Sequence, residues 1–256
     1  MSGYAALITG SSRGIGKGIA LALARAGFAI GINARKHNEE VEGTLAELSD
    51  LGVTAAAVVG DVGNIDGHQA MLDTAEAALG PLTTLVNNAG VSVMSRGDLL
   101  DVTPESYDRC QTINTRGAFF LTQAWASRVM ARERDPALHH AVITVSSANA
   151  LAASILRGEY CISKAGMSMM AKLFAVRLGG DDIGSYEIQP GLIETDMSAP
   201  AQDMYRRRIK EGLTITQRMG LPSDMGSIAA SMATGQLAFC TGQSVQADGG
   251  LLIQRF

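Results

Sequence analysis

The chain has 256 residues, which suits one large α/β domain that buries enough apolar surface to fold without disulfides or a structural metal. Its 21 basic and 25 acidic residues give a formal charge of −4 with no basic face, which argues against nucleic-acid binding. No uncharged apolar run reaches the ~18 residues of a membrane span, and the four histidines lack the i, i+4 spacing of helical metal ligands, so neither membrane insertion nor a metal site is expected. The three cysteines form no CxxC pair and no secretory signal precedes them, which predicts reduced thiols in a cytoplasmic protein.

Short apolar segments alternate with longer amphipathic ones along the chain. The apolar segments are rich in Val, Ile and Ala and lack strict alternation, as strands do in a parallel sheet that helices cover on both faces. Strands are predicted at Ala5–Thr9, Phe28–Asn33, Thr54–Val59, Thr84–Asn87, Ala141–Ser146, Tyr186–Ile188 and Ser244–Ala247. Helices are predicted at Ile15–Ala26, Glu39–Asp50, Ile65–Leu79, Glu105–Arg132, Tyr160–Leu178 and Pro222–Thr234. This order predicts a single α/β domain over residues 1–256, a doubly wound parallel seven-stranded sheet with helices on both faces.

Two connections interrupt the alternation. Residues 131–140 (ARERDPALHH) are highly charged and are expected to form a surface loop. Residues 192–218 form a long excursion after the sixth strand, where such folds carry ligand lids, so a substrate lid is predicted there. A pair of surface helices without a ligand role is the alternative.

A glycine-rich turn, TGSSRGIG from Thr9 to Gly16, follows the first strand. Glycines at such a turn let the backbone bend sharply and approach a pyrophosphate, whose charge then meets a helix N-terminus. The spacing is GxxxGxG rather than the GxGxxG of the common dinucleotide fingerprint, so an ordinary tight turn is the alternative for this motif alone.

Four further motifs follow in a fixed order. The NNAG run 87–90 follows the fourth strand, and Ser147 ends the fifth. Tyr160 and Lys164 then form a YxxxK motif at the start of a helix, and Pro190-Gly191 closes the sixth strand. With the glycine turn, this set resembles the short-chain dehydrogenase/reductase family over nearly the whole chain. The resemblance implies a single-domain Rossmann fold and an oxidoreductase that moves a hydride between nicotinamide and a carbonyl or alcohol carbon.

The candidate catalytic residues are Asn114, Ser147, Tyr160 and Lys164. Tyr160 and Lys164 lie one helical turn apart on the same face, where an ammonium would favour the phenolate and let the tyrosine exchange a proton with a substrate oxygen. Ser147 can hydrogen-bond the same oxygen as the hydride arrives. By resemblance, Lys164 also binds the nicotinamide ribose and Asn114 holds a water in a proton relay.

Charge at the end of the second strand favours NADP(H) over NAD(H). NAD-specific members of the family carry an acid there, whereas this chain has Ala34 followed by Arg35 and Lys36, which suit a 2′-phosphate. Arg13 can reach the same phosphate from the glycine turn, and solvated surface cations are the alternative. By resemblance, the other cofactor contacts are Gly10, Ser12, Gly14, Ile15, Gly16, Asp61, Val62, Asn87, Ala89, Gly90, Tyr160, Lys164, Pro190, Gly191, Ile193 and Thr195.

The substrate is less well defined. Within the family, the chain resembles the 3-oxoacyl-[acyl-carrier-protein] reductase branch in its length, in Arg13 and Gln243, and in the run 248–250 (DGG). It departs from that branch at residues 185–191, which read SYEIQPG instead of the usual V-N-x-I-x-P-G. Arg157 and Glu159 are expected near the mouth of the site, where an arginine could bind an anionic or polyhydroxylated substrate. A sugar, polyol or other small-carbonyl dehydrogenase is therefore the alternative within the family, and a catalytically silent dinucleotide-sensing protein is the alternative from another class.

The resemblance also implies a homotetramer. The segments Thr115–Met130 and Met167–Leu178 both offer apolar faces, and the chain ends near the apolar run Leu251-Leu252-Ile253. Burial of such faces between copies in a closed symmetric assembly is the expected outcome.

Overall fold

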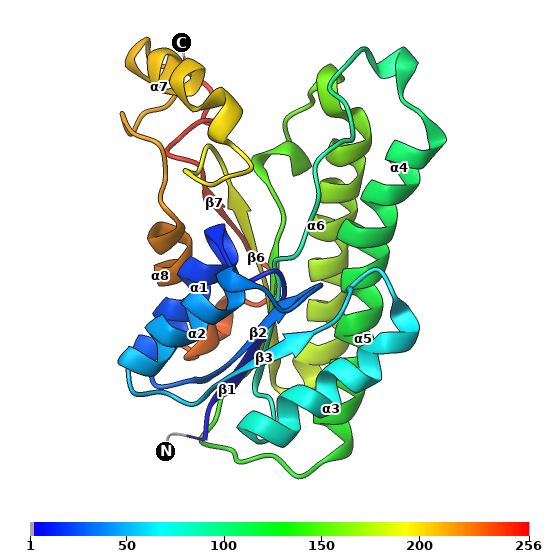
Figure 1. The fold of residues 1–256 in the computed structure, drawn as a ribbon, viewed down its shortest axis with the longest axis vertical. Coiled ribbons are helices and arrows are strands. Elements are labelled where there is room, and N and C mark those ends of the chain that lie inside the picture. The colour runs from blue at the N-terminus through cyan, green and yellow to red at the C-terminus, as the bar shows by residue number, and fades with distance from the viewer. Residues whose placement is uncertain (1–2, 256) are drawn as a thin grey trace.

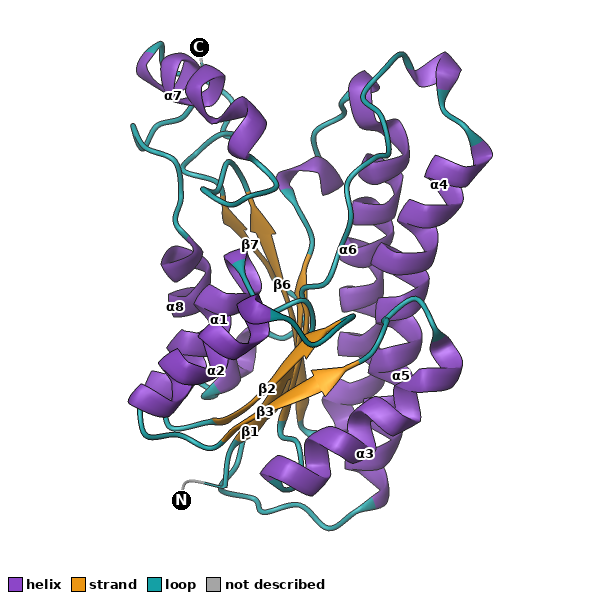
Figure 2. Cartoon of the chain, in the orientation of Figure 1, coloured by secondary structure: helices purple, strands orange, loops and turns teal. Residues whose placement is uncertain are grey.

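The computed structural model describes residues 3–255, which contain a seven-stranded sheet between two layers of helices (Figures 1 and 2). All neighbouring strands are parallel, in the order β3-β2-β1-β4-β5-β6-β7. The strands are β1 (Ala5–Ile8), β2 (Ala29–Ala34), β3 (Ala55–Val59), β4 (Thr84–Asn87), β5 (His140–Val145), β6 (Ile183–Pro190) and β7 (Ser244–Ala247). The predicted doubly wound parallel sheet is confirmed, and its order reverses between β1 and β4, where such sheets bind ligands.

Helices cover both faces of the sheet. One layer consists of α1 (Gly14–Arg25), α2 (Glu39–Asp50) and α8 (Pro222–Ala233), and the other of α3 (His68–Leu79), α5 (Ala118–Ala131) and α6 (Gly158–Leu178). Two shorter helices, α4 (Pro104–Cys110) and α7 (Gln202–Lys210), lie at the same end of the molecule on opposite sides (Figure 1). No helix in the range 3–255 is long and apolar enough to cross a membrane.

The two helical layers explain why the strands are apolar on both sides. In β1, Ala6 and Ile8 pack into the core under α1, α2 and α8, whereas Ala5 and Leu7 pack into the core under α3, α5 and α6. Successive side chains of a strand point to opposite faces, so a sheet with two covered faces has no solvent-facing set of side chains. All four of these residues are at most 1% exposed.

The long helix predicted at Glu105–Arg132 is interrupted, which corrects the sequence-based boundaries. The chain forms α4, then a π-helical turn over Gln111–Gly117, then α5. The predicted start is confirmed, because Thr103 caps α4 by accepting a hydrogen bond from the Ser106 amide. A π-helical turn inside an α-helix is uncommon and occurs often at functional sites.

β6 is longer than predicted. The sequence indicated Tyr186–Ile188, whereas the strand covers Ile183–Pro190 and is buried along its whole length. The apolar pattern did not reveal the full strand, because the strand also contains Ser185, Glu187 and Gln189, whose side chains form hydrogen bonds inside the protein. The other strands differ from their predicted ranges by only one residue at either end.

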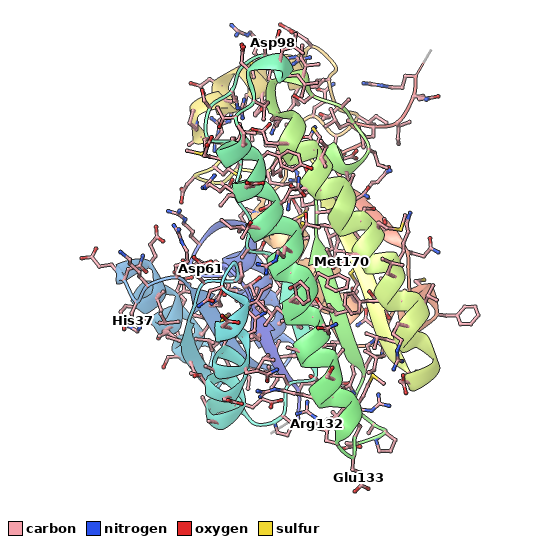
Figure 3. The ribbon with its side chains drawn as sticks, turned by 90° about the vertical axis from the view of Figure 1, so that its right-hand side faces the viewer. His37, Asp61, Asp98, Arg132, Glu133 and Met170 are labelled. Atoms are coloured by element: carbon pink, nitrogen blue, oxygen red, sulfur yellow. The ribbon has the colours of Figure 1, made fainter. Side chains whose placement is uncertain are left out.

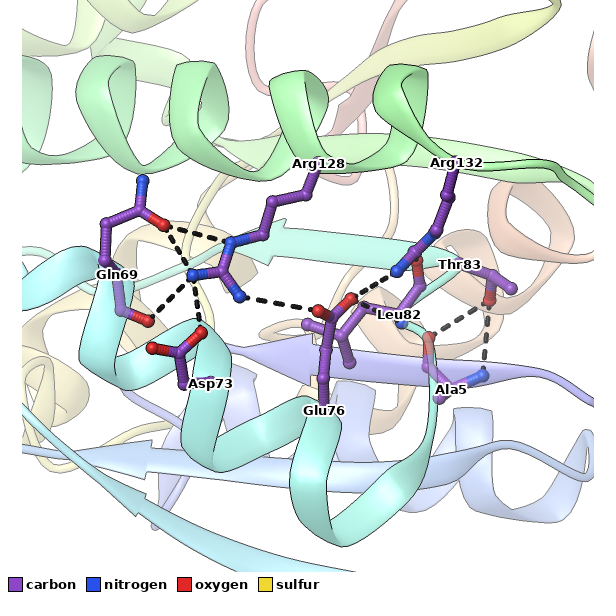
Figure 4. Close-up of polar contacts among 8 residues, drawn as sticks. All are labelled: Ala5, Gln69, Asp73, Glu76, Leu82, Thr83, Arg128 and Arg132. Atoms are coloured by element: carbon purple, nitrogen blue, oxygen red, sulfur yellow. Dashed lines mark hydrogen bonds and ion pairs between the residues drawn. The ribbon is translucent and has the colours of Figure 1, made fainter.

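Arg128 of α5 and Arg132, the residue that follows α5, hold α3 against this helix (Figure 4). Arg128 Nη1 lies 3.4 Å from Glu76 Oε2, and Arg132 Nη1 lies 2.5 Å from Glu76 Oε1. Glu76 Oε1 also accepts a hydrogen bond from the Leu82 amide at 3.1 Å. Arg128 Nη2 pairs in addition with Asp73 at 2.7 Å, but Asp73 is largely exposed whereas Glu76 is mostly buried.

We expect Glu76→Gln to lower the free energy of unfolding by about 1–2 kcal/mol, because hydrogen bonds to a partly buried charge are among the stronger ones. Asp73→Asn removes the same charge from the same helix at an exposed position and serves as the control, with an expected change within about 0.5 kcal/mol. Urea denaturation of the three proteins measures both values. Equal losses of unfolding free energy in the two variants would contradict the conclusion that Glu76 is the main ion-pair partner of the two arginines.

Candidate active site

The turn between β1 and α1 has the backbone geometry that the sequence predicted. Gly10 and Gly14 have φ of +60° and +56°, a conformation that favours glycine. A methyl group on Gly16 would lie 2.4 Å from the Gly10 carbonyl oxygen, so the turn and the first turn of α1 are in closest contact there. No side chain caps the N-terminus of α1, which leaves its first amides free for an anionic group. The arrangement fits a pyrophosphate.

Two asparagines hold this turn in place. Asn88 Nδ2 donates to the carbonyl oxygens of Thr9 at 2.8 Å and Gly10 at 2.9 Å. Asn33 Oδ1 accepts from the Gly10 amide at 3.2 Å, and its Nδ2 donates to the Val58 carbonyl at 2.9 Å. Neither was among the predicted site residues, although an amide side chain at the end of an otherwise apolar strand is a signal that could have been used.

Tyr160 and Lys164 lie in the first two turns of α6, beside the carboxyl end of β5. Lys164 Nζ donates to the Val145 carbonyl oxygen at 3.0 Å and lies 5.7 Å from the centre of the Tyr160 ring. Ser147 is the second residue after β5, and its Oγ accepts from the Asn149 amide at 3.1 Å. The structure therefore brings together three of the four residues predicted as catalytic.

Burial governs the acid–base properties of this group. Burial raises the pKa of the Tyr160 phenol, and its hydrogen bond with Ser147 lowers that pKa by less than burial raises it. Burial also lowers the pKa of the Lys164 ammonium to about 8. The expectation that the ammonium makes Tyr160 more acidic is therefore corrected for the protein alone, because loss of solvent outweighs the neighbouring charges.

Asn114, the fourth predicted catalytic residue, lies in the π-helical turn and is fully buried. Its Oδ1 accepts from the Val91 amide at 2.8 Å, and its Nδ2 donates to the Val91 carbonyl at 3.0 Å and to Ser163 Oγ at 2.9 Å. Ser163 belongs to α6, one residue before Lys164. Asn114 thus connects the segment after β4 to the helix that carries Tyr160.

Glycine contacts join the predicted motifs at one edge of the sheet. A methyl group on Gly90 would lie 3.2 Å from Asn114 Oδ1 and 3.5 Å from Lys164 Nζ. A methyl group on Gly10 would lie 2.9 Å from Ala89 Cα, and one on Gly14 would lie 3.5 Å from Thr195 Cγ2. The other residues predicted to contact the cofactor come in three groups, each at the carboxyl end of a strand. The groups are Ser12, Gly14, Ile15 and Gly16 after β1; Asn87, Ala89 and Gly90 at or after the end of β4; and Pro190, Gly191, Ile193 and Thr195 at or after the end of β6.

Asp61 and Val62 come after β3, the edge strand of the sheet, and Figure 3 labels Asp61. Asp61 is exposed and accepts from the Gly63 amide at 2.8 Å, whereas Val62 is buried. The Val62 carbonyl accepts from His68 Nε2 at 2.8 Å. Asp61 is therefore exposed at the edge of the sheet, and one of its carboxylate oxygens accepts from the Gly63 amide.

The cations predicted to bind a 2′-phosphate differ in their partners. β2 ends at Ala34 as expected, and Arg35 and Lys36 follow it on the surface. Arg13, in contrast, pairs with Glu40 at 2.8 Å and lies 3.7 Å from Asp196. Arg13 would have to exchange a carboxylate for a phosphate, whereas Arg35 would not.

Arg157 and Glu159 were expected together near the mouth of the site, and the structure corrects this for Glu159. Glu159 is 2% exposed and accepts from Ser106 Oγ at 2.6 Å, so it joins α6 to α4 inside the protein. Arg157 is only half-buried, and its guanidinium carbon lies 5.9 Å from the centre of the Tyr160 ring. Among the residues 3–255, no group of three or more His, Cys, Asp or Glu side chains is arranged to hold a metal ion.

Comparison with known proteins extends over the whole chain. The profile of a family described as enoyl-(acyl carrier protein) reductase matches residues 10–252. L-rhamnose 1-dehydrogenase (NAD(P)(+)) of Azotobacter vinelandii is 32% identical over 251 residues, which are 96% of each protein. The crystal structure of a 3-oxoacyl-[acyl-carrier protein] reductase from Brucella melitensis in complex with NAD has a TM-score of 0.95 and 38% identity, covering 99% of this chain and 98% of that one. A gluconate 5-dehydrogenase from Burkholderia cenocepacia in complex with NADP and tartrate has a TM-score of 0.89 and 30% identity, covering 100% and 97%.

Proposed function

Because the chain belongs to the short-chain dehydrogenase/reductase family and is an oxidoreductase, we propose that it interconverts a carbonyl and a secondary alcohol with NADP(H). The observation that carries the proposal is the group formed by Ser147, Tyr160 and Lys164 at the carboxyl end of β5. A bound nicotinamide dinucleotide supplies or accepts the hydride. Its pyrophosphate fits the glycine turn of residues 10–16, whose amides face outward at the start of α1.

The residues of the site divide the remaining work. Tyr160, which burial keeps protonated, donates a proton to the carbonyl oxygen in reduction and takes it back in oxidation. Ser147 interacts with Tyr160 and donates a hydrogen bond to the same oxygen, where negative charge develops. The Lys164 ammonium lies 5.7 Å from the centre of the Tyr160 ring, where its charge stabilises negative charge on the phenol. Asn114 holds the loop after β4 against α6 at Ser163, the residue before Lys164.

Tyr160→Phe keeps the ring and its packing but removes the oxygen that exchanges the proton. We expect kcat to fall by about 10²- to 10⁴-fold or more, with dinucleotide binding nearly unchanged. Turnover is measured with a panel of acetoacetyl thioesters, sugars, polyols and diketones, with both dinucleotides. Near-normal activity of the variant would contradict the proposal, and no turnover of any compound by the wild type would favour the catalytically silent binding protein.

Two substrate classes remain as candidates, each supported by a different observation. Exposed apolar residues, Leu151, Ile155 and Leu156, precede α6, and they support an acyl thioester of the kind a 3-oxoacyl-[acyl-carrier-protein] reductase uses. Arg157, close to the Tyr160 ring and without a carboxylate partner among residues 3–255, supports a sugar, polyol or sugar acid instead. The similarity to L-rhamnose 1-dehydrogenase supports the second class as strongly as the similarity to the reductase supports the first.

The segment 192–218 is proposed as the substrate lid. It contains α7, whose residues Tyr205 and Ile209 pack with Met219 into a small core separate from the two main ones. A separate core lets the segment move as a unit without opening the central sheet. α7 and α4 flank the carboxyl end of the sheet from opposite sides (Figure 1), which supports closure of α7 over a substrate beside Tyr160.

The preference for NADP(H) rests on the cations after β2. Arg35 follows the strand directly and has no ion-pair partner among the described residues. A 2′-phosphate offers a guanidinium two charge-assisted hydrogen bonds, whereas the ribose hydroxyl of NAD(H) does not match a cation. Lys36 can replace part of this interaction. The relatives compared above include complexes with NAD and with NADP, so the residues of this chain decide the preference.

Wild type is expected to bind NADPH more tightly than NADH, and Arg35→Asp is expected to reverse the order. Loss of one or two hydrogen bonds to the phosphate, at about 1.5–3 kcal/mol each, should weaken NADPH binding by roughly 10- to 150-fold or more. Fluorescence titration of both dinucleotides gives the dissociation constants. Arg25→Asp makes the same charge change at the end of α1 and should leave both constants unchanged. Equal binding of the two dinucleotides by the wild type would refute the assignment.

A homotetramer is proposed as the assembled form. A groove of about 410 Å³ runs between α5 and α6 and is lined by apolar residues that include Phe119, Met130 and Leu173. Val176, on the same helix α6, is 87% exposed. Figure 3 shows α5 and α6 side by side on this face, where a second copy could cover both.

Light scattering at micromolar concentration is expected to give the mass of four chains. Val176→Glu places a charge in the apolar face and should shift the mass toward smaller species without changing the circular dichroism spectrum, because burial of an unpaired charge is costly. A stable monomer in the wild type would refute the proposal.

A further inference from the structure

Glu187 is a carboxylate buried in β6 below the site just described. The residue is 1% exposed, and neither the family resemblance nor the mechanism above gives it a role. A buried carboxylate is costly unless several donors satisfy it, so its presence inside a central strand needs an explanation.

Four donors converge on this carboxylate. Ser168 Oγ donates to Oε2 at 2.9 Å, and Gln189 Nε2 donates to Oε1 at 3.1 Å. The hydroxyls of Ser146 and Ser244 donate to Oε1 and Oε2, respectively. The donors therefore come from α6, β6, β7 and the residue that follows β5. Each oxygen of the carboxylate therefore has two hydrogen-bond partners, which offset the cost of burying the group.

The carboxylate and the Lys164 ammonium lie against the same short stretch of the sheet. Ser168 is one turn after Lys164 on the same face of α6. Lys164 Nζ donates to the Val145 carbonyl, and Val145 pairs with Ile188, the residue after Glu187. The carboxylate thus acts on the ammonium through space, held at a fixed separation by Ser168 and by the strand pairing.

The other titratable groups around Lys164 are neutral near pH 7. Cys110, at the end of α4, faces it, and burial raises the pKa of that thiol. Tyr160, on the same helix, has a pKa raised by burial as well. Burial lowers the pKa of Lys164 to about 8, and Glu187 is the strongest influence in the opposite direction.

We propose that Glu187 is a positioning residue that keeps Lys164 in its ammonium form inside the protein. The proposal rests on the proposed roles of Tyr160 and Lys164 in the reaction. Without the carboxylate, the pKa of the buried amine would fall further, and less of the ammonium form would remain to stabilise negative charge on the phenol.

The test compares the pH dependence of kcat/KM for carbonyl reduction in matched variants. Glu187→Gln keeps the size of the side chain and removes its charge. The fall of kcat/KM at alkaline pH (the alkaline limb) should therefore begin about 1 pH unit lower than in the wild type, and kcat/KM should be restored at pH values below that fall. Ser244→Ala removes one donor to the same carboxylate and leaves the charge, so its limb should stay at the wild-type position. Glu187→Asp keeps the charge and should restore most of the wild-type limb.

Thermal unfolding shows which variants fold. Glu187→Ala is a second variant without the charge, and its side chain is smaller than that of glutamine. An alkaline limb at the wild-type position in a folded neutral variant would overturn the proposal. Failure of both neutral variants to fold would assign the carboxylate to folding and overturn it too. The Tyr160→Phe result separates the two levels: an active Tyr160→Phe contradicts the proposed function, whereas an inactive one with an unmoved Glu187→Gln limb contradicts only the role of Glu187.

Discussion

Coverage of the parallel sheet on both faces determines where polar chemistry can occur in this protein. Because helices shield each strand on either side, most side chains within the strands are apolar, with β6 as the main exception, and many polar side chains lie where the strands end. The glycine turn after β1, the run 87–90 after β4 and Ser147 after β5 all lie at that carboxyl edge. Asn33 and Asn88 then fix the glycine turn to the neighbouring strands through hydrogen bonds with backbone groups that no helix or strand satisfies.

The helices that cover the sheet also determine the acid–base properties of the side chains next to its carboxyl edge. Tyr160 and Lys164 enter from α6 and lose most of their contact with water, which favours the neutral form of each. The neutral phenol suits a proton donor, but a neutral amine does not suit a site that stabilises negative charge. In the role proposed for it, Glu187 is a second buried charge that favours the ammonium form of Lys164, and its four hydrogen-bond partners offset the cost of burying it.

The segments that bear the site are held together by contacts distant in sequence. Asn114 joins the loop at Val91 to Ser163 of α6, and the π-helical turn gives its side chain a direction that a regular α-helix would change. Ser106 and Glu159 make a second connection between α4 and α6. These two connections hold the helix that carries Tyr160 against the loop after β4 and against α4.

The sequence alone determined the fold class, the limits of most strands and helices, and the family. Apolar runs of strand length and amphipathic runs of helix length are local properties, and the motifs of residues 9–16, 87–90 and 160–164 are carried by consecutive residues. Tertiary structure alone decided the π-helical turn in the long helix, the full length of β6, the burial of Glu159 and the raised pKa of Tyr160. Each of these depends on partners far along the chain, such as Val91 for Asn114, Ser106 for Glu159 and Ser244 for Glu187, and no local pattern specifies which polar group meets which.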